Sequence, residues 1–159
     1  MILFAALVSI IYYTLKLGIS PMPTTRKARS AILSLLPSKV QGEVVELGSG
    51  WGGMALELAR KYPSCQVTAY ELSWVPFLFS QLRGRPSNLE WRRQDFLKAD
   101  LSSVKLVVVY LYPGAMQKLA SLLPPDAIII SNTFALPGRT PTAIVHLDDL
   151  YRTPIYLYL

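Results

Sequence analysis

A run of glycines follows a strongly apolar segment about a third of the way along the chain. Residues 43–53 read EVVELGSGWGG, with a glutamate two positions before the first glycine. Glycine tolerates positive φ angles and lets a ligand approach the main chain closely. A helix that begins after such a turn offers free N–H groups to that ligand. The pattern predicts a buried strand, a turn that binds a nucleotide-like molecule, and a helix.

Segments of strand and helix length alternate after this point. Strands are expected at 44–47, 66–71, 89–92, 104–111 and 127–131, with helices at 54–61, 75–82 and 115–123. The apolar segments 142–147 and 154–159 are too close for a helical crossover, so they predict an antiparallel hairpin at one edge. We therefore expect an α/β fold: a doubly wound, mostly parallel, seven-stranded Rossmann-like sheet that ends in this hairpin.

The N-terminal region is apolar and lies outside this alternation. Residues 2–15 are uncharged, and the apolar character continues past Lys16 to Ile19. Eighteen helical residues rise about 27 Å, close to the ~30 Å hydrocarbon core of a bilayer. We expect an uncleaved N-terminal hydrophobic helix that anchors the chain in a membrane over residues 1–19. A linker at 20–25 and a single domain at 26–159 follow, and a cleaved signal peptide is the alternative.

The distribution of charge favours a membrane over a nucleic acid. The net charge is +6, yet residues 1–42 contain five basic residues and no acid, and the rest of the chain is nearly balanced. Arg26, Lys27 and Arg29 follow the apolar segment, which predicts a domain on the cytoplasmic or organellar inner side. With one cysteine, Cys65, and one histidine, His146, neither a disulfide framework nor a metal site is expected.

The glycine run by itself is compatible with two classes of cofactor. Gly48, Gly50 and Gly53 fit the dinucleotide pattern G-x-G-x-x-G, and Glu71 ends the next predicted strand, where a ribose-binding acid belongs. Glu46, however, would repel a pyrophosphate and would suit a cationic ligand. A dehydrogenase is therefore the more remote alternative.

The order acid, any residue, G-x-G-x-G, together with the terminal hairpin, resembles the class I S-adenosylmethionine-dependent methyltransferases. The resemblance implies S-adenosylmethionine as cofactor, with Glu46 facing its ammonium-bearing end and Glu71 accepting hydrogen bonds from its ribose. Asp95 would contact the adenine and Phe96 would cover one adenine face. The cofactor-binding residues implied are Glu46, Gly48, Ser49, Gly50, Gly52, Glu71, Leu72, Asp95 and Phe96.

The methyl acceptor is expected to lie against the segment after the fourth predicted strand. Tyr110, Leu111, Tyr112 and Pro113 follow that strand, and aromatic rings attract an alkylammonium such as lysine. An apolar aromatic site also lowers the pKa of a lysine, as attack on a methyl group requires. Because strand residues alternate in direction, at most one tyrosine should line the pocket, and Tyr110 is the candidate catalytic residue.

A closer resemblance is to the small membrane-anchored protein-lysine methyltransferases related to the ATP synthase c-subunit lysine methyltransferase family. It implies a protein substrate, and a membrane protein is one candidate. The chain departs from that family at Trp51, where relatives commonly carry an acid, and at Ser73, where an asparagine is usual. Two alternatives stay open: a small-molecule or lipid methyltransferase, and a module that binds the cofactor without turnover.

Overall fold

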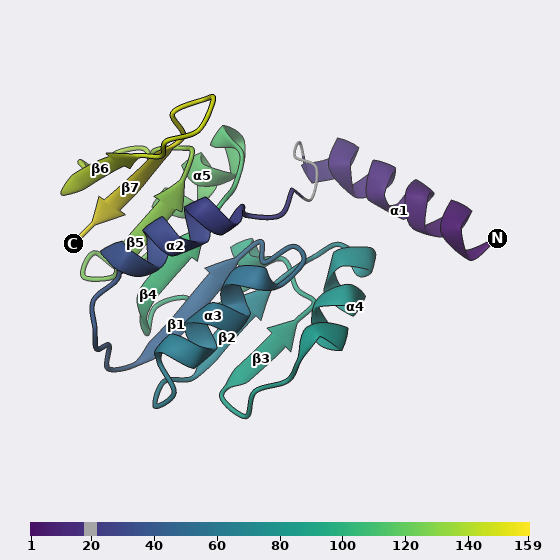
Figure 1. Cartoon of the computed structure of the whole chain (residues 1–159), viewed down its shortest axis with the longest axis horizontal. Helices are drawn as coiled ribbons and strands as arrows, with labels where there is room; N and C mark the ends of the chain where they lie inside the picture. The colour runs from purple at the N-terminus through teal and green to yellow at the C-terminus, as the bar shows by residue number, and fades with distance from the viewer. Residues whose placement is uncertain (18–21) are drawn as a thin grey trace.

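The computed structural model describes residues 1–17 and 22–159 and contains a mixed sheet of seven strands (Figure 1). The strand order is β3-β2-β1-β4-β5-β7-β6, and the first five strands are parallel. β7 runs antiparallel to both β5 and β6, as the predicted hairpin requires. The strands are β1 (Glu43–Leu47), β2 (Val67–Tyr70), β3 (Leu89–Arg92), β4 (Val104–Val109), β5 (Ile128–Asn132), β6 (Ala143–His146) and β7 (Pro154–Tyr158).

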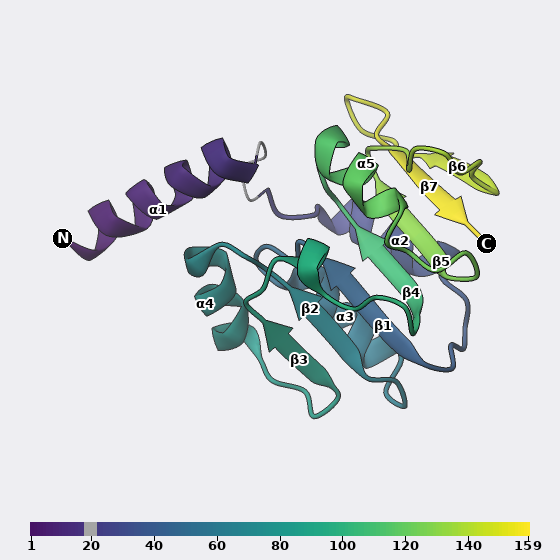
Figure 2. The ribbon, with the colours of Figure 1, turned by 180° about the vertical axis from the view of Figure 1, so that it is seen from behind.

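Helices cover both faces of the sheet (Figures 1 and 2). Alternate residues of the central strands point to opposite faces: Val44 packs with α2 and α3, whereas Val45 packs with α5. Each face is therefore apolar, which explains the nearly continuous hydrophobic sequence of β1 and β4. The helices are α1 (Ile2–Leu17), α2 (Arg26–Leu35), α3 (Gly53–Lys61), α4 (Trp74–Arg83), η1 (Phe96–Lys98) and α5 (Pro113–Ala120).

Local sequence determines where the helices around the site begin. Thr25 caps α2, because its side chain accepts a 3.2 Å hydrogen bond from the Ala28 backbone N–H. Pro113 occupies the first turn of α5, where its missing N–H costs no helical hydrogen bond. β4 ends at Val109, two residues before the predicted end at 111, so Tyr110 and Leu111 lie outside the strand.

The apolar N-terminal segment forms α1, which projects beyond the sheet and contacts α4 (Figures 1 and 2). Within residues 1–17 and 22–159, no helix combines the length and the apolar content that a bilayer crossing demands. The membrane anchor over residues 1–19 therefore stays a prediction. Residues 18–21, which include parts of the predicted anchor and linker, lie outside the described residues.

Candidate active site

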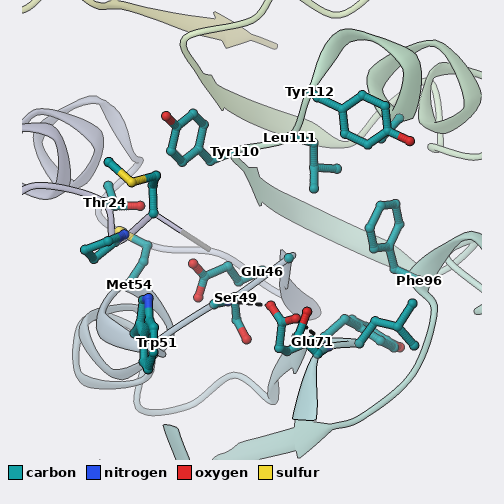
Figure 3. Close-up of a pocket in the computed structure, with 18 of the residues that line it drawn as sticks. Thr24, Glu46, Ser49, Trp51, Met54, Glu71, Phe96, Tyr110, Leu111 and Tyr112 are labelled. Atoms are coloured by element: carbon teal, nitrogen blue, oxygen red, sulfur yellow. Dashed lines mark hydrogen bonds between the residues drawn. The ribbon is translucent and has the colours of Figure 1, made fainter. Parts of the chain in front are cut away.

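A cavity of about 450 Å³ opens beyond the carboxyl ends of β1, β2 and β4 (Figure 3). In a doubly wound sheet, this edge is where ligands bind. Segments from distant parts of the sequence line the cavity: the glycine turn, the residues after β2, the start of η1 and the segment after β4. Residues 22–24, just before α2, complete its wall.

The glycine turn adopts backbone angles that favour glycine. Gly48, Gly50 and Gly52 have φ angles of 77°, 52° and 77°. A Cβ atom at Gly52 would lie 2.5 Å from the Trp91 ring and 2.7 Å from the Ser80 Cβ. Gly52 therefore permits close packing behind the turn and does not itself line the cavity, and its contact with the cofactor stays a prediction.

Glu71 holds the glycine turn in place from the end of β2. Its carboxylate accepts hydrogen bonds from the backbone N–H groups of Gly50, at 2.8 Å, and Ser73, at 2.7 Å (Figure 3). The residue is only 7% exposed and lines the cavity. Each carboxylate oxygen accepts more than one hydrogen bond, so Glu71 retains capacity for ligand hydroxyl groups.

Glu46 places a second carboxylate in the same cavity from β1. It is 6% exposed, and its Oε2 atom meets no hydrogen-bond donor in the described part of the chain. Burial raises the pKa of this carboxyl well above its usual range, repulsion from Glu71 raises it further, and the Ala55 backbone N–H and Arg29 lower it. A buried carboxylate oxygen without a partner is costly, so the site is suited to a cationic ligand.

The residues expected around an adenine lie in the same cavity as Glu46 and Glu71. Leu72, Asp95 and Phe96 all line it. Asp95 also caps η1, because one of its oxygens accepts a 3.1 Å hydrogen bond from the Leu97 backbone N–H. Its second oxygen and the Phe96 ring are left to contact a ligand, and the adenine contacts of both residues stay predictions.

Tyr110 and Tyr112 both line the cavity, so the expectation that only one would do so is wrong. The prediction rested on strand alternation, but β4 ends at Val109, so both tyrosines lie outside the strand. Figure 3 shows the Tyr110 ring across from Glu46 and the Tyr112 ring near Phe96, with Leu111 between them. Leu111 is buried against Gly48, whereas Pro113 begins α5 and is not part of the lining.

Several lining residues were not predicted from the sequence. Arg29 reaches the cavity from α2, together with residues 22–24 and the side chains of Trp51 and Met54. Arg29 and residues 22–24 come from the region before the first strand, and only the packing of α2 against the sheet brings them to the site. The sequence of a short amphipathic helix does not indicate that one of its basic residues will reach a cavity.

Comparison with known proteins identifies the family. Residues 46–143, from the buried glutamate of β1 to the start of β6, match the model of the ANTKMT methyltransferase domain. The chain belongs to the ANTKMT methyltransferase domain family. This methyltransferase domain is therefore of the class I, S-adenosylmethionine-dependent type, and S-adenosylmethionine is its cofactor.

The names of two relatives of this methyltransferase domain describe different methyl acceptors. It is 33% identical to the adenine nucleotide translocase lysine N-methyltransferase of Mus musculus over 72% of the chain and 52% of that protein. It is 33% identical to the release factor glutamine methyltransferase of Koribacter versatilis over 50% of the chain and 29% of that protein. The chain thus spans about half or less of the length of these relatives.

A solved structure supports the fold of this methyltransferase domain. An RNA methyltransferase from Salinibacter ruber, crystallised with S-adenosyl-L-homocysteine, aligns with a TM-score of 0.74 and 24% identity. The alignment covers 86% of this chain and 92% of that chain. At this identity, the similarity establishes the architecture of the sheet and its helices.

The residues of the cavity fit the cofactor chemically. The orphaned Oε2 atom of Glu46 suits an ammonium group, and a fully ionised carboxylate would form a charge-assisted hydrogen bond with it. Ser49, whose Oγ is likewise without a partner among the described residues, adds a hydroxyl to the same wall. Glu71 supplies acceptors for ribose hydroxyls.

Proposed function

We propose that this domain transfers the methyl group of S-adenosylmethionine to the side-chain amine of a protein lysine. The observation that carries the proposal is that Tyr110 and Tyr112 line the same cavity as Glu46 and Glu71. Donor and acceptor would therefore meet in one chamber, between aromatic rings that favour an alkylammonium. The similarity to a lysine N-methyltransferase of Mus musculus supports the choice of acceptor.

The protein's task in this reaction is alignment. The cofactor supplies an activated methyl group on a sulfonium, so the amine nitrogen forms the new N–C bond as the C–S bond breaks and the electron pair stays on sulfur. Glu46 and Glu71 would hold the donor from one side, while Tyr110 would orient the acceptor amine from the other. The lysine must arrive without its proton, and the apolar surroundings of the tyrosines favour the neutral amine.

The outer surface of α1 and α4 supports a membrane location for this reaction. Large apolar side chains are exposed on both helices: Phe4, Leu7, Ile11 and Leu15 on α1, and Trp74, Leu78, Phe79 and Leu82 on α4. The five basic residues in 1–42 would complement anionic headgroups. We propose that this surface lies on the cytoplasmic or organellar inner face of a membrane and brings a membrane protein to the cavity.

Binding to lipid vesicles tests the membrane location. Wild-type protein should sediment with vesicles that contain anionic lipid, and a Leu78→Glu/Leu82→Glu variant of α4 should sediment several-fold less, with unchanged thermal stability. Ile144→Glu, on the exposed face of β6, is the matched control and should behave as wild type. Equal sedimentation of all three proteins would contradict the proposed surface.

The same exposed surface favours a second candidate, a lipid or lipid-like methyl acceptor that enters from the membrane. Incubation of the purified protein with methyl-labelled S-adenosylmethionine and a membrane extract separates the two. Label in protein, recovered as methyl-lysine after hydrolysis, is the expected result. Label in the lipid fraction would support the second candidate, and bound cofactor without transfer would favour a module that lacks turnover.

A further inference from the structure

Arg29 is a charged side chain of the cavity that the proposed reaction has not used. It reaches the cavity wall from α2, and its side chain is 18% exposed. Gly53, the first residue of α3, lies beside it: a Cβ atom there would be in van der Waals contact with Arg29 Nη1, at 3.4 Å. The start of α3 therefore faces an arginine that comes from outside the sheet.

Two hydrogen bonds fix the guanidinium but do not exhaust it. Arg29 Nε donates to Glu57 Oε1 at 2.7 Å, and Nη1 donates to the Thr24 carbonyl oxygen at 2.6 Å. A guanidinium has five N–H donors in a planar fork. Within the described chain, these two bonds leave donors available to a ligand in the cavity. The Thr24 contact also secures residues 22–24, which form part of the cavity wall.

Arg29 and Glu46 carry opposite charges in the same cavity. Both residues line the cavity, and the charge of Arg29 lowers the pKa of the Glu46 carboxyl. Among the described residues, the ion pairs of Arg29 include Glu57 and not Glu46. Within the described chain, a cation and an anion thus line one cavity without pairing with each other, an arrangement that is complementary to a ligand with both charges.

We propose that Arg29 and Glu46 form a subsite for an α-amino-acid zwitterion, in which Arg29 binds the carboxylate and Glu46 binds the ammonium of the cofactor. Arginine suits a carboxylate because its fork forms two parallel hydrogen bonds. This inference rests on the proposed function, since the zwitterion is the amino-acid end of S-adenosylmethionine. It assigns α2 to cofactor recognition, although that helix precedes the residues that match the family model.

Calorimetric titration with two ligands tests the subsite. S-adenosylmethionine and its decarboxylated analogue share the ammonium, the sulfonium and the nucleoside, and differ only in the carboxylate. Wild-type protein should bind S-adenosylmethionine at least about tenfold more tightly. Arg29→Gln should remove this preference by weakening S-adenosylmethionine binding alone, and Arg29→Lys should retain part of it through its charge.

Glu57→Gln is the matched control. It breaks the same ion pair, but Glu57 does not line the cavity, so the variant should keep the wild-type preference. Equal wild-type affinities for the two ligands would overturn the inference even if no variant folds. A loss in Arg29→Gln that is equal for both ligands, or is reproduced by Glu57→Gln, would also overturn it, because Arg29 would then be structural. If wild-type protein binds neither ligand, the proposed function itself fails.

Discussion

The Glu71 carboxylate accepts a 2.8 Å hydrogen bond from the backbone N–H of Gly50 and thereby joins the end of β2 to the glycine turn. A residue expected only to bind ribose therefore also shapes the loop that surrounds the ligand. Its second oxygen accepts the Ser73 N–H at the start of α4. The affinity for the cofactor and the stability of the turn depend on the same side chain.

Glu71→Ala should lower both the stability of the protein and its affinity for the cofactor. The two backbone N–H groups would lose their acceptor, at a cost of about 1–3 kcal/mol in the free energy of unfolding. The affinity for S-adenosylhomocysteine should fall more than tenfold, as measured by calorimetric titration. Glu71→Gln keeps one carbonyl acceptor and should lose less of each. Unchanged binding by Glu71→Ala would remove the ribose assignment.

The glycine turn gives a prediction that separates packing from backbone strain. Gly52→Ala should reduce the free energy of unfolding by ~2–4 kcal/mol, because the new methyl group adds a clash with Trp91 to the strain of a positive φ. Gly50→Ala has a positive φ but no heavy atom within 4 Å of the added Cβ, so it should lose only about 1–2 kcal/mol. Chemical denaturation of both variants measures the difference, and equal losses would contradict the packing role of Gly52.

Glu46 should make the stability of the ligand-free protein depend on pH. Burial raises its pKa in the folded state, so the folded protein retains this proton more tightly than the unfolded chain. As the pH rises above the ordinary value of 4.5 toward the raised folded-state pKa, the contribution of Glu46 to stability falls.

Glu46→Gln should therefore stabilise the ligand-free protein at about pH 8 and have little effect near pH 4, in denaturation experiments at both values. The same variant should bind S-adenosylhomocysteine about tenfold more weakly at the higher pH, since the partner of the ammonium loses its charge. A variant that gains stability without losing affinity would show that Glu46 is not the ammonium contact.

Tyr110 should affect turnover more than cofactor binding. Removal of its ring in Tyr110→Ala takes away a cation–π contact that contributes ~1–2 kcal/mol, so kcat/KM should fall about tenfold or more. The affinity for S-adenosylhomocysteine should change less than about twofold, and Tyr110→Phe should keep most of the turnover. Equal losses of kcat/KM and of cofactor affinity in Tyr110→Ala would place Tyr110 at the cofactor instead.

The sequence predicted the parts of the site that local patterns determine. The glycine spacing indicated the turn, and the ends of parallel strands brought Glu46 and Glu71 to one edge, where both line the cavity. The alternation of segments predicted seven strands, and the short separation of the last two predicted their antiparallel pairing. These features follow from periodicity and chain length, which a single sequence contains.

The remaining features depend on contacts between distant residues. Arg29 reaches the cavity only because α2 packs on the sheet, and Gly52 is required by Trp91, almost forty residues later in the chain. Tyr110 and Tyr112 share the cavity because the strand ends before them, and strand boundaries are the least certain part of any pattern-based prediction. α1 is helical as expected, whereas its contact with α4 was not predicted.

Mass spectrometry of methylated proteins tests the central claim most directly. Membrane fractions from cells that express the wild-type chain, from cells that express Tyr110→Ala, and from cells that lack the chain are compared for methyl-lysine. We predict at least one lysine site that is methylated with the wild-type chain, strongly reduced with Tyr110→Ala, and unmethylated without the chain. Identical lysine methylation in all three samples would contradict the assignment of this domain as a protein-lysine methyltransferase.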